Sequence, residues 1–160
     1  MGLPPFRGYP GVMWKNRPAV TLLELLSVLA LLGVFLSFAF PRFQHAADVF
    51  SVRAARDAVL GAAARARALA IARGEAQLLV DEPTATVAIT TQGGAQRHSS
   101  FDLAQRYGVT VDIANSTRTS ALVEYDVIGL GRFAALTVRL QRRSAVAGVT
   151  FSAYGRPRGW

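Results

Sequence analysis

The sequence contains no cysteine, which excludes a disulfide framework, a thiolate nucleophile and a zinc site with cysteine ligands. Histidine is also scarce, because His45 and His98 are the two in the chain and they lie far apart in sequence. No grouping of histidine, serine and acid that would serve catalysis is legible. We therefore predict that the protein is not an enzyme and uses no cofactor or metal ion.

Negative charge is also in short supply, with 10 acidic residues against 18 lysines and arginines. The formal net charge is +8, and all but one of the basic residues are arginine. This balance favours an anionic partner such as nucleic acid, lipid headgroups or an acidic protein. A GC-rich genome also encodes arginine and alanine freely, so the overall charge alone does not choose among these partners.

A long hydrophobic run is present near the N-terminus. Residues 1–19 hold four prolines, three glycines, three cations and no acid, which is typical of a leader peptide. The 22 residues from Ala19 to Phe40 carry one charge, Glu24, and would span about 33 Å as a helix at about 1.5 Å per residue. We predict that residues 20–41 cross a membrane, with the basic N-terminus in the cytoplasm.

The next segment, residues 42–73, has the period of an amphipathic helix. Small and apolar residues recur at spacings of three and four: Val52, Ala55, Val59, Ala62, Ala63, Ala66, Leu69 and Ala70. Gly74 supplies a stop directly after Arg73. Pro41 is expected to bend a continuous helix rather than end it.

From Gly74 onward the period of apolar residues changes to two. Alternating stretches centre on Ile89, Val111, Tyr125, Val138 and Phe151, with turn signals between them. Residues 74–160 are therefore predicted to form a β-rich head whose antiparallel sheet packs on the helix, an α+β fold class. His98 is expected in a polar loop, and Gly129 to Gly131 in a turn.

Glu24 needs an explanation, because an acid in a membrane segment indicates a function and calls for a partner. Cleavage between Ala19 and Val20 would place a free amine one helical turn from Glu24. In an assembly, the amine of one subunit would neutralise Glu24 of its neighbour. A secretory signal peptide cut near Ala39, or a plain single-pass anchor, are alternatives that leave Glu24 unexplained.

The stretch from Ala19 to Glu24, with the basic leader and Pro41, resembles the N-terminal signal of type IV prepilins and type II secretion pseudopilins. The resemblance implies cleavage after Ala19 and methylation of Val20 by a prepilin peptidase/methyltransferase. It also implies that Thr21, Glu24 and Pro41 serve assembly with other pilins or pseudopilins. The family usually has glycine before the cut and phenylalanine after it, where this chain has Ala19 and Val20.

Two further stretches, Ala62–Asp81 and Gly148–Gly159, resemble the GspH/FimT group of minor pilins and pseudopilins. Gly155, Arg156, Pro157 and Arg158 look like the Gly-Arg-x-Arg motif of FimT-type minor pilins, which bind DNA during natural transformation. The resemblance implies a single-pass inner-membrane protein with a periplasmic head that joins a pilus or pseudopilus.

The distribution of charge along the head supports a basic C-terminal end. From Val127 to Trp160 there is no acid, and six arginines occur: Arg132, Arg139, Arg142, Arg143, Arg156 and Arg158. We predict that these arginines bind the phosphates of double-stranded DNA. The alternative is a GspH-like pseudopilin of a type II secretion system, with a structural role and no DNA binding.

Overall fold

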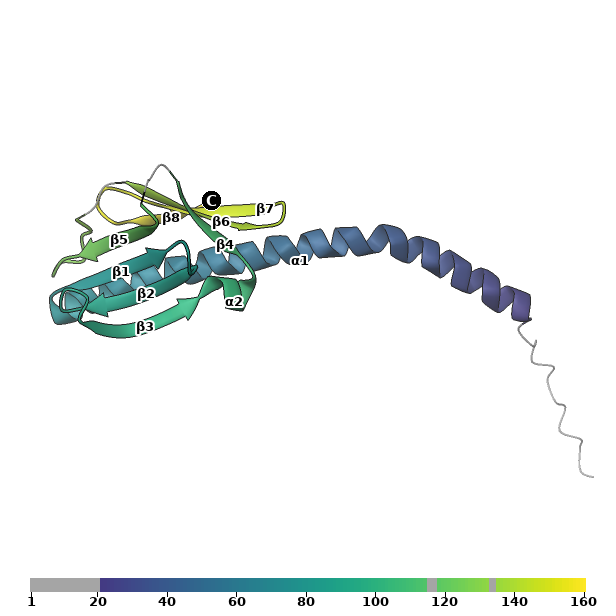
Figure 1. Cartoon of the computed structure of the whole chain (residues 1–160), viewed down its shortest axis with the longest axis horizontal. Helices are drawn as coiled ribbons and strands as arrows, with labels where there is room; N and C mark the ends of the chain where they lie inside the picture. Colours follow the sequence, from purple (N-terminus) through teal and green to yellow (C-terminus); the bar gives the residue numbers. More distant parts are fainter. Residues whose placement is uncertain (1–20, 115–117, 133–134) are drawn as a thin grey trace, which may run out of the picture. The chain divides into compact units, whose positions relative to one another are not determined.

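The structure, a computed structural model, describes residues 21–114, 118–132 and 135–160 (Figure 1). The predicted leader and the cleavage site between Ala19 and Val20 lie outside the described residues.

Helix α1 runs from Leu22 to Arg73 and continues through Pro41, as the sequence predicted. Thr21 begins it, because the Thr21 hydroxyl oxygen accepts a hydrogen bond from the Glu24 N–H at 3.2 Å. The chain divides into two compact units, and the first ends at Ala39. In this unit the described side chains are all exposed, and by length and composition α1 is able to cross a membrane.

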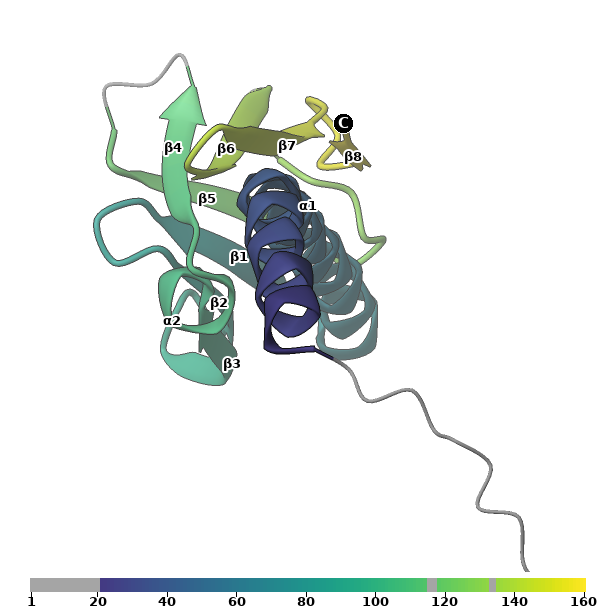
Figure 2. The same ribbon diagram turned by 90° about the vertical axis from the view of Figure 1, so that its right-hand side faces the viewer.

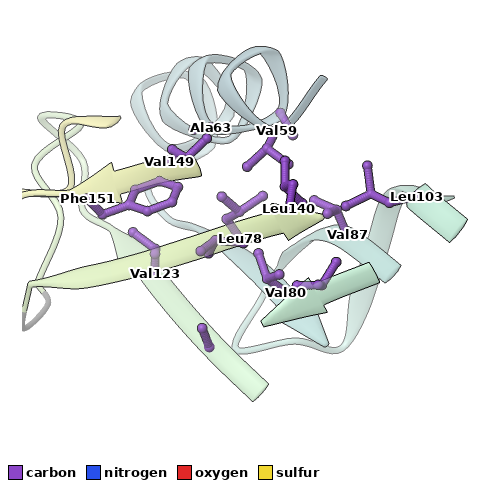
Figure 3. Packing of buried hydrophobic residues seen from close by; sticks show 14 of the residues in the cluster. Val59, Ala63, Leu78, Val80, Val87, Leu103, Val123, Leu140, Val149 and Phe151 are labelled. Carbon is purple, nitrogen blue, oxygen red and sulfur yellow. The ribbon is translucent and has the colours of Figure 1, made fainter. Parts of the chain in front are cut away.

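The second unit, from Phe40 to Trp160, holds the rest of α1 and all of the strands. The predicted apolar stripe of α1 is confirmed, since seven of its eight residues are buried and Leu69 is half-buried. Most of these residues are alanine, and Figure 2 shows α1 beside the strands of the head. Figure 3 shows side chains of α1, such as Val59, packed with strand residues such as Leu78, Leu140 and Phe151 in one core.

The described residues of the head form eight strands and a short helix. Their bounds are β1 (Ala76–Asp81), β2 (Thr86–Thr91), β3 (Gln96–Asp102), α2 (Leu103–Tyr107), β4 (Thr110–Ala114), β5 (Ser120–Tyr125), β6 (Leu136–Arg142), β7 (Ala145–Phe151) and β8 (Pro157–Gly159). The first sheet has the order β3-β2-β1-β5 and the second β4-β6-β7-β8, and all pairs are antiparallel. The predicted α+β fold is confirmed, although the strands divide into two sheets and not one.

The expected polar loop at His98 is wrong, because His98 lies in β3. This strand is the edge of the first sheet, so water reaches much of it and its sequence needs no apolar alternation. Helix α2 was also missed. Its start is fixed by the Asp102 carboxylate, which accepts from the Gln105 N–H, and its end by Gly108 with φ +65°.

Candidate nucleic-acid interface

The basic motif near the C-terminus forms part of an ordered edge strand. Strand β8 pairs with β7, with Arg158 opposite Thr150 and Pro157 opposite Phe151. The backbone of Trp160 extends the pairing, since its N–H donates to the Gly148 carbonyl at 3.0 Å and its carbonyl accepts from the Gly148 N–H at 3.1 Å. Pro157 and Arg158 of the motif are therefore held in an extended conformation against the second sheet.

The position of Gly155 explains why the motif begins with glycine. Its φ of +71° lies in the left-handed region, which strains any residue with a side chain. A Cβ atom at this position would also lie 2.8 Å from the Gly131 Cα. The backbone of Gly155 is fixed from the first sheet, because the Tyr125 hydroxyl donates to its carbonyl oxygen at 2.9 Å.

Burial raises the pKa of the Tyr125 hydroxyl to about 12, and the nearby Arg67 guanidinium opposes part of that rise. The phenol therefore stays protonated and able to donate to Gly155 across the neutral pH range.

Arg156 and Arg158 are both exposed; Arg158 lies in the edge strand β8 and Arg156 directly before it. The Ser152 N–H donates to the Arg156 carbonyl at 3.0 Å, which continues the pairing of β7 and β8 by one residue. Because alternate residues of an extended chain point to the same side, Arg156 and Arg158 are placed on the same face. Because Arg158 is opposite Thr150, this is the outer face of the second sheet, turned away from buried Val149 and Phe151. Neither arginine forms an ion pair within the residues that the structure describes.

Arg139 lies on the same outer face. It stands on β6 opposite Gly148 of β7, one row away from the pair of Thr150 and Arg158. The nearest carboxylate belongs to Asp112 on β4, at 4.0 Å, and both side chains are more than half exposed. An exposed ion pair at this distance contributes little to stability, so Arg139 remains accessible to a phosphate.

Arg142 and Arg143 are placed differently, at the turn between β6 and β7. The Arg142 Nε lies 2.9 Å from one oxygen of Asp48, and the Arg143 Nη1 lies 3.2 Å from the other. Arg142 also donates to the Ser51 hydroxyl at 2.8 Å and to the Tyr107 carbonyl at 2.7 Å. Both arginines thus hold α1 against the second sheet.

Asp48 was not identified from the sequence, although a signal was present. It stands four residues before Val52, on the stripe of α1 that faces the core, and its side chain is 5% exposed. An acid at such a position needs cationic partners. The partners lie more than 90 residues along the chain, and sequence spacing alone did not show which arginines they are.

Arg132 is surrounded by negative charge. It lines a cavity of about 270 Å³ together with Glu75, Glu124 and Asp126, near the end of α1. Three carboxylates around this cavity make it unfavourable for a phosphate. Of the six predicted arginines, the structure therefore brings Arg139, Arg156 and Arg158 together on one face and places the other three elsewhere.

The two histidines do not meet. His45 is exposed on α1, whereas His98 Nε2 lies 2.8 Å from the Thr91 hydroxyl and 3.3 Å from an Arg73 nitrogen. Among residues 21–114, 118–132 and 135–160, no group of three metal-ligating side chains is present. Gly129 closes a turn that begins at Asp126, as predicted, whereas Gly131 forms a β-bridge with Tyr125.

The predicted assembly residues Thr21, Glu24 and Pro41 all belong to the exposed N-terminal part of the described chain. Glu24 lies in the first turn of α1, and its carboxylate has no ion pair with any described residue. The amine expected to face Glu24 would belong to Val20, which lies outside the described residues.

A long N-terminal helix followed by an antiparallel β head is the architecture of type IV pilins, and this chain has that fold. Among solved structures it is similar to the type IV minor pilin FimU of Pseudomonas aeruginosa strain PAO1, with a TM-score of 0.53. The similarity covers 67% of this chain and 86% of FimU at 13% sequence identity, so it shows the fold alone. No family model and no curated protein matches the chain.

Proposed function

We propose that this chain is a minor pilin-like subunit of a type IV filament, of the GspH/FimT type. It is made as a precursor, cleaved between Ala19 and Val20 and methylated on Val20. It is held in the bacterial inner membrane with its head in the periplasm until other pilins draw it into the filament. The pilin fold and the exposed apolar start of α1 support this proposal.

Glu24 supports the assembly step. Its carboxylate lies on an apolar helix surface and has no cationic partner within the described part of the chain. A charge in lipid is costly unless it is paired. The N-terminal amine of a neighbouring subunit supplies the missing charge, so that pairing favours the assembled state.

We further propose that the head binds double-stranded DNA for uptake. The observation that carries this proposal is the pair Arg156 and Arg158, which are exposed at the start of β8 and meet no carboxylate among the described residues. Arg139 adds a third cation on the same face. Guanidinium groups bind phosphate oxygens bidentately, and a rigid strand keeps them in place for that contact.

The test uses the full-length chain in detergent micelles, titrated with a short duplex at two salt concentrations. Arg156→Ala with Arg158→Ala is expected to weaken binding and to reduce the slope of log affinity against log salt by about 0.9 per lost contact. The control, Arg97→Ala with Arg106→Ala, removes two exposed cations from the other sheet and from α2. It has the same net charge and is expected to retain most of the affinity.

Two results would overturn the DNA proposal: no binding by the unaltered chain at low salt, or equal loss in both double variants. A pseudopilin of a type II secretion system, with a structural role, would then explain the fold better.

A further inference from the structure

Trp160 lies across the outer face of the second sheet in a fixed position. A Cβ atom on Gly148 would lie 2.4, 2.6 and 3.0 Å from the Cζ2, Cε2 and Cη2 atoms of Trp160, so its six-membered ring covers this glycine. The indole N–H donates to the Thr150 hydroxyl at 3.2 Å. One face of the ring is thus against β7, while 52% of the residue remains exposed.

Cations stand on two sides of this ring. Arg139 lies directly across β7 from it, because it is opposite Gly148 on β6. Arg158 precedes Trp160 by two residues, and the backbone bonds of Trp160 to Gly148 extend the strand pairing, so the two residues are placed on the same face. Together, Arg139, Arg158 and the indole make an aromatic surface with an arginine residue on either side, which we call the Trp160 platform.

The edge of the platform continues into a groove of about 360 Å³ between α1 and β7. Trp160 forms one wall, and Arg53 and Arg56 of α1 lie on another. Among the described residues, none that lines this groove is acidic, although Arg56 is paired with Asp57 beside it. The positive lining continues the charge of β8 toward the helix.

A fixed, exposed aromatic ring between cations has the features of a stacking site for an unpaired base. In a duplex the faces of the bases are covered by their neighbours, so an indole ring has no base to stack on. In a single strand each base has a free face, and its phosphates lie within reach of flanking cations. The platform therefore offers a single strand a contact that a duplex is unable to make.

We infer that the Trp160 platform binds single-stranded nucleic acid, with one base stacked on the indole and adjacent phosphates held by Arg139 and Arg158. This inference rests on the proposed nucleic-acid function of the same face and adds the form of the ligand. The binding order is then single strand over duplex, at equal length and equal salt.

The test begins from Trp14→Phe, which leaves Trp160 as the single tryptophan of the full-length chain in detergent micelles. The probe is an oligothymidylate of about 12 nucleotides, within the range that single-strand-binding folds cover. It is expected to quench the fluorescence of Trp160, whereas a duplex of the same length is not. Arg139→Ala is expected to lower the affinity for the single strand, because it removes a flanking cation.

Trp160→Ala is expected to lower the affinity for the oligothymidylate by about 5- to 150-fold, the usual cost of one lost stacking contact. Its affinity for the duplex should stay unchanged, which also shows that the head is folded. Trp160→Phe should retain most of the single-strand affinity, and Trp160→Leu, which fills space without an aromatic face, should not. Phe50→Ala removes an exposed aromatic residue from α1 and is the matched control.

The outcomes separate the two proposals. If the unaltered chain binds neither ligand, the nucleic-acid function itself fails. If the unaltered chain binds both ligands, two results for Trp160→Ala and Trp160→Leu would contradict the stacking inference: an unchanged affinity for the single strand, or an equal loss of affinity for both ligands. The proposed phosphate contacts would then remain. If Trp160→Ala does not fold, the quenching result and Trp160→Leu decide the question.

Discussion

The hydroxyl of Tyr125 donates a hydrogen bond of 2.9 Å to the carbonyl oxygen of Gly155 and so connects the last strand of the first sheet to the basic motif of the second. The contact is close because Gly131 and Gly155 meet backbone to backbone beside it, without side chains between them. The orientation of Arg156 and Arg158 thus depends on a residue that precedes them by some 30 positions in the chain.

The first prediction concerns the stability of the head at alkaline pH. Folding raises the pKa of Tyr125 from 10.0 to about 12, so the folded state binds the phenol proton more tightly than the unfolded state does. Its contribution is complete below about pH 10 and is lost as the pH rises from about 10 through about 12. The loss is expected to be about 2 to 3 kcal/mol, measured as the free energy of unfolding of the chain in detergent.

Tyr125→Phe should remove this part of the pH dependence. At neutral pH the variant should be less stable by about 1 to 3 kcal/mol, because the Gly155 carbonyl is left without its donor. Tyr154→Phe, at an exposed position, is the control. Equal alkaline slopes in Tyr125→Phe and the unaltered chain would contradict the assignment.

The second prediction compares two glycines with positive φ. Gly93 has φ +62° and open space around it, so Gly93→Ala should cost about 1 kcal/mol for the backbone alone. Gly155→Ala should cost about 1 to 3 kcal/mol more, because the new methyl group meets the Gly131 backbone. Urea denaturation gives the free energy of unfolding of both variants. An equal loss in the two would show that the close approach of Gly155 to Gly131 does not affect stability.

The third prediction concerns the buried acid of α1. Asp48→Asn should destabilise the head by about 1.5 to 3 kcal/mol, because it removes the negative charge between Arg142 and Arg143 and turns an N–H donor toward one of them. Asp57→Asn is the matched control, since it removes the more exposed pair with Arg56 and should change stability by at most about 1 kcal/mol. Similar effects of the two changes would mean that the Asp48 contacts are not structural.

The fourth prediction concerns processing and assembly. Mass spectrometry of the membrane-extracted protein should find a chain that begins at N-methylated Val20. Glu24→Ala should leave the head folded, because its core lies in a separate unit, and should lower incorporation into filaments. Sheared filaments provide the measurement of incorporation. A chain that begins at Met1 or near Phe40, or normal incorporation of the variant, would count against the proposed pairing of Glu24.

The sequence was sufficient for the fold because periodicity is a local signal. Spacings of three and four identified the buried face of α1, and alternation identified strands such as β6 and β7. The same signal failed for β3, where an edge strand with polar residues resembles a loop. It also failed to divide the strands between two sheets, because pairing depends on contacts between distant segments.

The candidate interface was predictable in part. Charge counting found the basic C-terminal end, but it did not distinguish exposed Arg156 from Arg142, which binds Asp48. That difference depends on a helix residue more than 90 positions away. The position of the Trp160 ring over Gly148 is a relation between side chain and backbone that spacing does not encode.

The buried face of α1 has one more consequence, for the mechanical behaviour of the head. It consists of five alanines, two valines and Asp48, so the helix presents few ridges that interlock with the strands around it. Short side chains resist sliding along the helix axis poorly. The axial position of α1 relative to the strands therefore depends in part on Asp48, and a pull along the helix would load its bonds to Arg142 and Arg143.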